Sequence, residues 1–182
     1  RRRAEAPEGV EAGELPGGVV GTQMTNYGLE SAFNKRGIEF ARAKVGDRYV
    51  LEILRQKKWL IGGENSGHIL CLDRHSTGDA IIAALEVLRA LVERDVSLAD
   101  AAADVTLLPQ ELINVRIDKA SPWADKPAVK ATLADWEAKL AGHGRILLRP
   151  SGTEPVVRVM VEAEDAALAR QGAEAIAAAV AA

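Results

Sequence analysis

Short apolar runs alternate with helix-type patterns from residue 19 to about residue 93, and this alternation constrains the fold more than any other feature. A short apolar run is typical of a buried strand, whereas apolar residues three and four apart mark one face of a helix. Strands that alternate with helices predict an α/β domain. We expect strands near residues 19–22, 38–45, 59–61 and 69–72, and helices near 29–33, 47–57 and 80–93.

Polar residues mark where two of these helices begin. We expect Asp47 to cap the second helix, because a carboxylate there accepts hydrogen bonds from free backbone N–H groups, and Thr77-Gly78-Asp79 to open the third. The third helix has a continuous apolar face, which consists of Ile81, Leu85, Leu88 and Val92.

A second pattern begins near residue 107, where the alternation pauses. A strand at 112–118 is followed by a helix, whose first turn can contain Pro127 because proline is tolerated there. Two strands joined by a tight loop come next. Asp165 can cap an alanine-rich terminal helix. The order β-α-β-β-α predicts a small α+β domain with its helices on one face of the sheet.

The predicted domain boundaries follow from these patterns and from composition. Residues 1–18 are charged, rich in Ala, Glu and Gly, and end in Pro-Gly-Gly, which is typical of a linker or of the remnant of a preceding domain. We expect the α/β domain over residues 19–106 and the α+β domain over residues 107–182.

Charge and composition exclude several classes of function. A net charge of −3 provides no positive field for nucleic acid, and Trp 3, Tyr 2 and Phe 2 are too few for stacking platforms. Charged residues interrupt every apolar stretch before the roughly 20 residues that a spanning helix needs. We therefore expect neither nucleic acid nor a membrane as a partner.

The cysteine and histidine counts bear on location and metal binding. Cys71 has no partner for an internal disulfide, so we expect a reducing compartment, the cytoplasm. One cysteine and three scattered histidines form no recognisable zinc site, and we predict no metal ligands in this chain.

The loop Arg149-Pro150-Ser151-Gly152-Thr153-Glu154-Pro155, with an arginine just beyond it, suits an anionic ligand. The glycine lets neighbouring backbone N–H groups converge, the hydroxyls add donors, and guanidinium groups pair bidentately with phosphate oxygens. The alternative is a hairpin turn whose hydroxyls bond the local backbone and whose arginines are solvated. The candidate phosphate ligands are Arg149, Ser151, Gly152, Thr153 and Arg158.

A second polar loop, Gly62–His68, lies between two apolar strands. In it, Glu64 can accept hydrogen bonds from vicinal hydroxyls, and Ser66 and His68 can each donate or accept, a set that fits a sugar. Partial desolvation between the strands also makes Glu64 a candidate for proton transfer. The alternative is a simple connection in which Glu64 is solvated and His68 completes a core hydrogen bond.

Taken together, the two loops resemble the sugar-binding and phosphate-binding loops of the α-D-phosphohexomutase superfamily. Residues 20–30 and 45–50 are similar to further stretches of that family, so the resemblance spans residues 19–163 nearly continuously. It is greatest to the bacterial branch that acts on glucosamine phosphates. Asn65 is a departure, because the family more often has glutamine there.

The resemblance implies a four-domain enzyme of which this chain holds the third and fourth domains. The third would be a three-layer α/β domain with a mixed sheet, and the fourth a small TBP-like α+β domain. The first two domains, which would be this chain's protein partners, would supply a phosphoryl-carrying serine and an Asp-rich loop that holds Mg²⁺. We therefore expect the isolated chain to bind substrate and to lack activity.

The resemblance also implies roles for the loop residues. Glu64, Ser66 and His68 would bind sugar hydroxyls. The phosphate would be bound by Arg149, Ser151, Gly152, Thr153 and Arg158. The implied reaction interconverts glucosamine 6-phosphate and glucosamine 1-phosphate through glucosamine 1,6-bisphosphate, for amino-sugar nucleotide and cell-wall precursor synthesis. The alternatives are part of a phosphomannomutase or phosphoglucomutase, or a non-catalytic phosphosugar-binding module.

Overall fold

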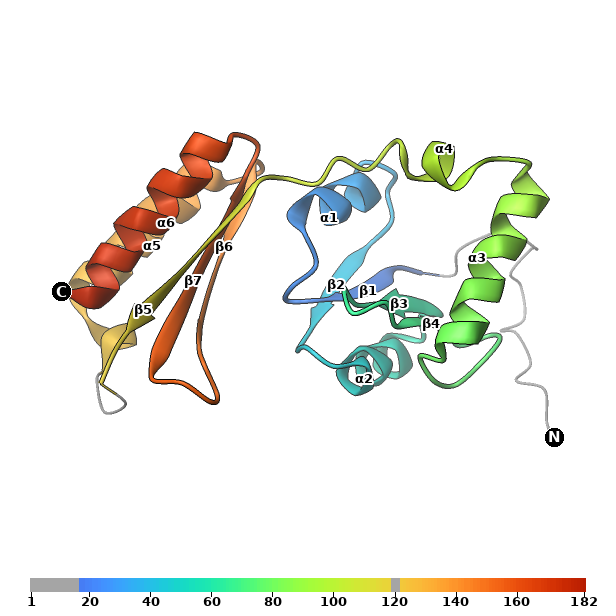
Figure 1. The fold of residues 1–182 in the computed structure, drawn as a ribbon, viewed down its shortest axis with the longest axis horizontal. Coiled ribbons are helices and arrows are strands. Elements are labelled where there is room, and N and C mark those ends of the chain that lie inside the picture. The colour runs from blue at the N-terminus through green and yellow to red at the C-terminus, as the bar shows by residue number, and fades with distance from the viewer. Residues whose placement is uncertain (1–16, 119–121) are drawn as a thin grey trace. The chain divides into compact units, whose positions relative to one another are not determined.

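The computed structural model describes residues 17–118 and 122–182 (Figure 1). The linker predicted over residues 1–18 falls almost entirely outside the described residues. The chain divides into two compact units, with the junction between Thr106 and Leu107. We call the part that ends at Thr106 unit 1 and the part that begins at Leu107 unit 2.

Unit 1 contains a four-stranded mixed sheet and four helices among its described residues. Its elements are β1 (Val19–Thr22), α1 (Tyr27–Asn34), β2 (Phe40–Ala43), α2 (Asp47–Lys57), β3 (Ile61–Gly63), β4 (Ile69–Cys71), α3 (Ala80–Arg94) and α4 (Leu98–Ala102). The strand order is β2-β1-β3-β4, in which β1 is parallel to both neighbours and β4 is antiparallel to β3. The predicted α/β fold with a mixed sheet is confirmed.

Helices α1 and α2 pack on opposite faces of this sheet. Val20 of β1 is buried in one cluster with Val50 of α2. Phe33 of α1 instead stacks on Phe40 of β2, with ring centroids 5.9 Å apart, and Phe40 is the Cα partner of Val19. Since successive residues of a strand point to opposite faces, Val19 lies on the face that α1 covers and Val20 on the face that α2 covers.

The start of α2 differs from the prediction. Asp47 is the first residue of the helix rather than its cap, and Gly46 takes the N-cap position with φ of +122°, a conformation that favours glycine. The Asp47 carboxylate accepts a hydrogen bond from the Arg48 N–H, 2.7 Å away, rather than from later turns of the helix.

The start of α3 is as predicted, but its apolar face is not covered. Asp79 caps the helix and accepts hydrogen bonds from the N–H groups of Ile82 and Ile81, which hold the pKa of its carboxyl below the usual value. The four predicted face residues are 57–79% exposed, whereas Ala83 is buried. Within the described residues, α3 therefore packs through a neighbouring face that includes Ala83 and the half-buried side chains of Ile82 and Val87.

Unit 2 is a three-stranded antiparallel sheet with helices. Its elements are β5 (Gln110–Arg116), the 3₁₀ helix η1 (Trp123–Asp125), α5 (Pro127–Leu140), β6 (Gly144–Pro150), β7 (Val156–Ala163) and α6 (Ala166–Ala181). The strand order is β5-β7-β6. The predicted small α+β fold is confirmed. Asp165 caps α6 as expected and accepts from the Leu168 N–H at 2.8 Å.

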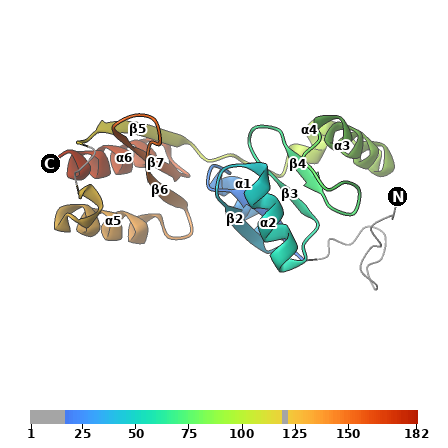
Figure 2. The ribbon, with the colours of Figure 1, turned by 90° about the horizontal axis from the view of Figure 1, so that it is seen from below.

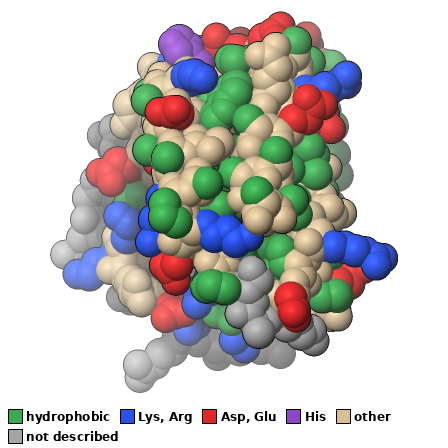
Figure 3. Space-filling model, turned by 90° about the vertical axis from the view of Figure 1, so that its left-hand side faces the viewer, with side chains coloured by type: hydrophobic (Ala, Val, Ile, Leu, Met, Phe, Trp, Pro, Cys, Tyr) green, Lys and Arg blue, Asp and Glu red, His purple; other side chains and the backbone are tan. Residues whose placement is uncertain are grey.

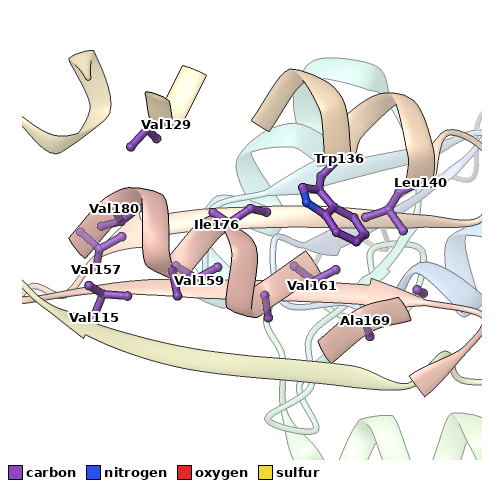
Figure 4. Close-up of a cluster of buried hydrophobic side chains, with 13 residues drawn as sticks. Val115, Val129, Trp136, Leu140, Val157, Val159, Val161, Ala169, Ile176 and Val180 are labelled. Carbon is purple, nitrogen blue, oxygen red and sulfur yellow. The ribbon is translucent and has the colours of Figure 1, made fainter. Parts of the chain in front are cut away.

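Both long helices of unit 2 cover the same face of its sheet (Figure 2). Val157, Val159 and Val161 of the central strand β7 are fully buried beneath them, in a cluster with Trp136 of α5 and Ile176 of α6 (Figure 4). Because side chains alternate along a strand, the residues between these valines point to the opposite face of the sheet.

The surface drawn in Figure 3 carries acidic and basic side chains interspersed with hydrophobic ones. In the part of the chain that the structure describes, no helix combines the length and the hydropathy needed to cross a bilayer.

Candidate functional site

The Glu64, Ser66 and His68 side chains come together in the connection between β3 and β4. The Ser66 Oγ lies 2.7 Å from Glu64 Oε1 and 2.8 Å from His68 Nδ1. Since a carboxylate only accepts, the hydroxyl donates its proton to Glu64 and accepts from a protonated Nδ1 of His68. His68 Nδ1 is also 3.2 Å from Glu64 Oε1. The three predicted sugar ligands thus form one hydrogen-bonded cluster.

The second carboxylate oxygen of Glu64 is held from a different loop. The backbone N–H of Gly46 donates to Glu64 Oε2 at 3.1 Å, across a sequence separation of 18 residues. The Glu64 side chain is only 10% exposed, whereas that of His68 is 46% exposed. The alternative of a solvated Glu64 is therefore wrong in this structure, and so is a core hydrogen bond for His68.

Three loops meet here because three parallel strands end at the same edge of the sheet. β1, β2 and β3 run in the same direction and are followed by residues 23–26, 44–46 and 64–68. The Asn65 Nδ2 donates to the backbone carbonyl of Met24 at 3.0 Å, which ties the first loop to the third. Ligands of open α/β sheets bind at the carboxyl ends of the strands, so the fold places this cluster where a ligand site is expected.

Interpretation of the sequence missed three residues of this edge. It did not identify Gly46 as the donor to Glu64, Asn65 as a link between loops, or Lys44 as a nearby cation. Lys44 directly follows β2, and its Nζ lies 5.9 Å from the ring centroid of Tyr49. Lys44, Gly46 and Asn65 all closely follow parallel strands, and this position in the sequence was the signal that could have identified them.

An apolar hollow of about 290 Å³ lies beside the cluster, on the α1 face of the sheet. Glu64 and Asn65 are among its lining residues, but most of the lining is apolar and includes Leu29, Phe33 and Phe40. A sugar needs hydrogen-bonding groups around its hydroxyls, so the hollow itself does not suit a sugar ring. The polar side of Glu64, towards Ser66 and His68, is the side suited to hydroxyls.

The second candidate loop joins β6 and β7 in unit 2. The Ser151 Oγ accepts long hydrogen bonds from the N–H groups of Thr153 and Glu154, at 3.4 Å and 3.3 Å, and the Ser151 N–H donates to the Val156 carbonyl at 2.8 Å. Apart from the two adjoining residues, no described atom lies within 4 Å of the position of a Cβ added to Gly152. The local bonds of a hairpin turn are present, and the tip has open space around it.

The two arginines beside this loop are directly opposed. Arg149 of β6 is the Cα partner of Arg158 of β7. Arg158 lies 3.6 Å from Glu154, whereas Arg149 makes no ion pair with any described residue. Like charges directly opposite in a ladder are destabilising, and a bound anion would relieve this repulsion. The geometry therefore favours an anion at this loop over a plain surface turn.

The residues described here do not fit a magnesium site. Among residues 17–118 and 122–182, no group of three or more His, Cys, Asp or Glu side chains is arranged to hold a metal ion. Mg²⁺ prefers octahedral oxygen ligands, usually one or two carboxylates with waters or phosphate oxygens.

Comparison with known families assigns both units. Residues 6–107 match the family described as phosphoglucomutase/phosphomannomutase, alpha/beta/alpha domain III, and residues 112–179 match its C-terminal domain. The chain belongs to the phosphoglucomutase/phosphomannomutase family. The expected correspondence with the third and fourth domains of phosphohexomutases is confirmed.

Curated relatives of this family member carry the name phosphoglucosamine mutase. The protein from Ralstonia pickettii is 58% identical over 167 residues, which cover 92% of this chain and 37% of the relative. That from Chromobacterium violaceum is 61% identical over 168 residues, with 92% and 37% covered. The chain thus spans well under half the length of the curated relatives that it matches.

Solved structures of phosphohexomutases share the fold. An N-acetylphosphoglucosamine mutase from Aspergillus fumigatus, in complex with GlcNAc-6P and magnesium, superposes with a TM-score of 0.72 at 23% identity and covers 91% of this chain and 42% of that one. A second structure of the enzyme from A. fumigatus gives a TM-score of 0.76 at 23% identity, with 92% and 38% covered.

Proposed function

We propose that the chain is the substrate-binding part of a phosphoglucosamine mutase, which interconverts glucosamine 6-phosphate and glucosamine 1-phosphate. The identity of 57–61% to relatives with that name, over 92–98% of this chain, supports the proposal. The observation that carries it is the Glu64–Ser66–His68 cluster at the carboxyl ends of three parallel strands.

In this proposal the cluster binds the sugar. Glu64 accepts hydrogen bonds from two vicinal hydroxyls, and its hold by Gly46 fixes the carboxylate plane before the ligand arrives. The exposed Ser66 and His68 exchange their mutual hydrogen bond for bonds to hydroxyls. Orientation of the ring is the main role of Glu64, and proton transfer at the reacting hydroxyl is a secondary one.

The loop of unit 2 binds the phosphate that does not react. Arg149 and Arg158 pair with its oxygens, Ser151 and Thr153 donate hydroxyl hydrogens, and Gly152 leaves the backbone open to the ligand. Charge-assisted bonds from the two arginines would contribute more than the neutral hydroxyl donors do.

The reaction needs a fixed phosphate site because the ligand must bind in two orientations. A phosphoserine transfers its phosphoryl group to O1 of glucosamine 6-phosphate, so that one P–O bond breaks and another forms to give glucosamine 1,6-bisphosphate. After the bisphosphate turns over, the serine takes back the phosphoryl group from O6. In each orientation, the phosphate at the far end meets the same arginines.

The phosphoserine and the Mg²⁺ that the family implies belong, in this proposal, to domains outside this chain. The described residues contain no group of three or more His, Cys, Asp or Glu side chains placed to hold a metal ion, and the chain's own contribution is to bind and orient the ligand. We therefore expect the 182-residue chain to bind glucosamine 6-phosphate without converting it. The cytoplasmic location inferred from the single cysteine stays a prediction.

A phosphomannomutase or phosphoglucomutase is the second candidate, because the matching family carries both names. Titration calorimetry of the 182-residue chain distinguishes the candidates. Tighter binding of glucosamine 6-phosphate than of glucose 6-phosphate or mannose 6-phosphate supports the proposal, and the reverse order contradicts it. Equal binding of all three, with none to unphosphorylated glucosamine, would favour a general phosphosugar-binding module.

A further inference from the structure

The end of β5 places another arginine beside the loop between β6 and β7. In the antiparallel ladder, Asn114 is the Cα partner of Arg158 and Arg116 is the Cα partner of Val156. Val115, between them, is buried with the helix-covered core of unit 2. Because side chains alternate along a strand, Arg116 lies on the opposite face, which is the face of Arg158.

The same face carries a polar row across all three strands. Arg158 on the central strand has Asn114 on one side and Arg149 on the other. The next row towards the loop contains Arg116 and Val156, and the Val156 carbonyl accepts a hydrogen bond from the Ser151 N–H. Arg116 is therefore in line with the first residue of the loop.

A backbone hydrogen bond fixes this neighbourhood. The Ile117 N–H donates to the Pro155 carbonyl at 3.0 Å, so the end of β5 is tied directly to the end of the loop. Since adjacent strands lie about 4.8 Å apart, an extended arginine side chain spans the distance from β5 to a ligand held over β7.

The charges on this face are unbalanced. Arg116 is exposed and makes no ion pair with any residue in the described ranges. Three arginines, Arg116, Arg149 and Arg158, therefore stand against the carboxylate of Glu154, 3.6 Å from Arg158, and that of Asp118, two residues beyond Arg116. Cations gathered without counter-charges raise the free energy of the folded chain, and an anion with two negative charges would lower it.

We propose that Arg116 is a third cation of the phosphate site and sets the preference of the chain for phosphorylated over unphosphorylated sugar. This inference rests on the proposed phosphate-binding role of the loop. Arg116 approaches the phosphate from the β5 side, opposite to Arg149 on β6, so that the two strands flank the ligand. Its long side chain stays in solvent until a phosphate draws it over Val156.

The test compares three variants of the 182-residue chain by titration calorimetry with glucosamine 6-phosphate and with inorganic phosphate. Arg116→Ala should weaken both affinities by about threefold or more, the size expected for a partly solvated charge pair. Arg116→Lys should restore most of the loss. Arg170→Ala is the matched control, because Arg170 is an exposed arginine of unit 2 on α6, 3.9 Å from Glu111.

Two further measurements separate ligand binding from a structural role. Without ligand, the thermal midpoint of none of the three variants should fall below that of the unaltered chain. The difference in affinity between the unaltered chain and Arg116→Ala should shrink at 0.5 M salt, where screening shortens the range of charge interactions. A fall in the thermal midpoint that Arg116→Lys does not reverse would mean that Arg116 supports the fold instead.

The outcomes distinguish this inference from the proposed function. If the unaltered chain binds both ligands and Arg116→Ala binds them equally well, Arg116 is not part of the site and the proposed function stands. If the unaltered chain binds neither ligand, the proposed function fails, and the role of Arg116 fails with it.

Discussion

Arg149 and Arg158 lie directly opposite each other in the ladder between β6 and β7, at the base of the loop that carries Ser151, Gly152 and Thr153. Two guanidinium groups in this position repel each other unless an anion lies between them. If the loop binds a phosphate as we propose, the anion should relieve this repulsion and stabilise the folded chain.

Replacement of Arg149 by alanine tests this relationship. The variant should bind glucosamine 6-phosphate at least tenfold more weakly, because a hydrogen bond to a charged group contributes about 1.5–3 kcal/mol. Its thermal midpoint without ligand should not fall, since the replacement removes a repulsion. Calorimetric titration and thermal unfolding measure the two effects, and an unchanged affinity would refute the assigned role of Arg149.

Gly62 should be intolerant of any side chain. A Cβ at this position would lie 2.6 Å from Val50 Cγ1 and 2.8 Å from the Val20 carbonyl oxygen, so β3 and α2 would have to separate. Gly62→Ala should lower the free energy of unfolding by about 1–3 kcal/mol, measured by urea denaturation. Gly152→Ala is the control, with open space around the added Cβ and an expected change within about 0.5 kcal/mol. Equal effects at the two glycines would contradict the packing described here.

The apolar face of α3 should contribute little to the stability of this chain. Leu54 of α2 is fully buried, whereas Leu85 of α3 is 59% exposed. Leu54→Ala should cost about 2–5 kcal/mol of unfolding free energy through the cavity that it leaves. Leu85→Ala should cost well under half of that, and a comparable loss at both positions would show that α3 is covered in solution.

Cys71 should react slowly with thiol reagents. Burial raises the pKa of its thiol above the ordinary 9.0, and the carboxylates of Asp73 and Glu86 raise it further. Less thiolate is then present near pH 8, so alkylation by iodoacetamide should be slower in the folded chain than in urea. The unfolded chain loses this proton first as the pH rises through 9.0, so the folded state should become less stable above that pH. Equal rates of alkylation in the folded and the unfolded chain would contradict the predicted slow reaction of Cys71.

Local chemistry decided which features could be predicted from the sequence. The segment that ends in Asp79 was predicted to open its helix, and Asp79 does so through local bonds to N–H groups two and three residues away. Asp47 was assigned wrongly because Gly46 takes the cap position, with φ of +122°, and its N–H bonds to Glu64, 18 residues further along. The apolar face of α3 shows the same limit, since periodicity identifies a face but not what covers it.

The two candidate loops were visible in the sequence, whereas their surroundings were not. Glu64, Ser66 and His68 alternate within five residues, so their cluster follows from one local turn. The partners from other strands depend on register and strand order, which no local pattern contains. For this reason two residues were identified only in the folded chain: Lys44, which follows β2, and Arg116, which ends β5.

The most direct test of the account is nuclear magnetic resonance of the 182-residue chain titrated with glucosamine 6-phosphate. We expect shifts of backbone resonances in residues 64–68 and 149–153, with none at His143, an exposed residue in the turn that precedes β6. Glucosamine without phosphate should leave the resonances of residues 149–153 unchanged. If glucosamine 6-phosphate leaves both loops unchanged at millimolar concentration, the chain does not bind this substrate and the proposed function is wrong.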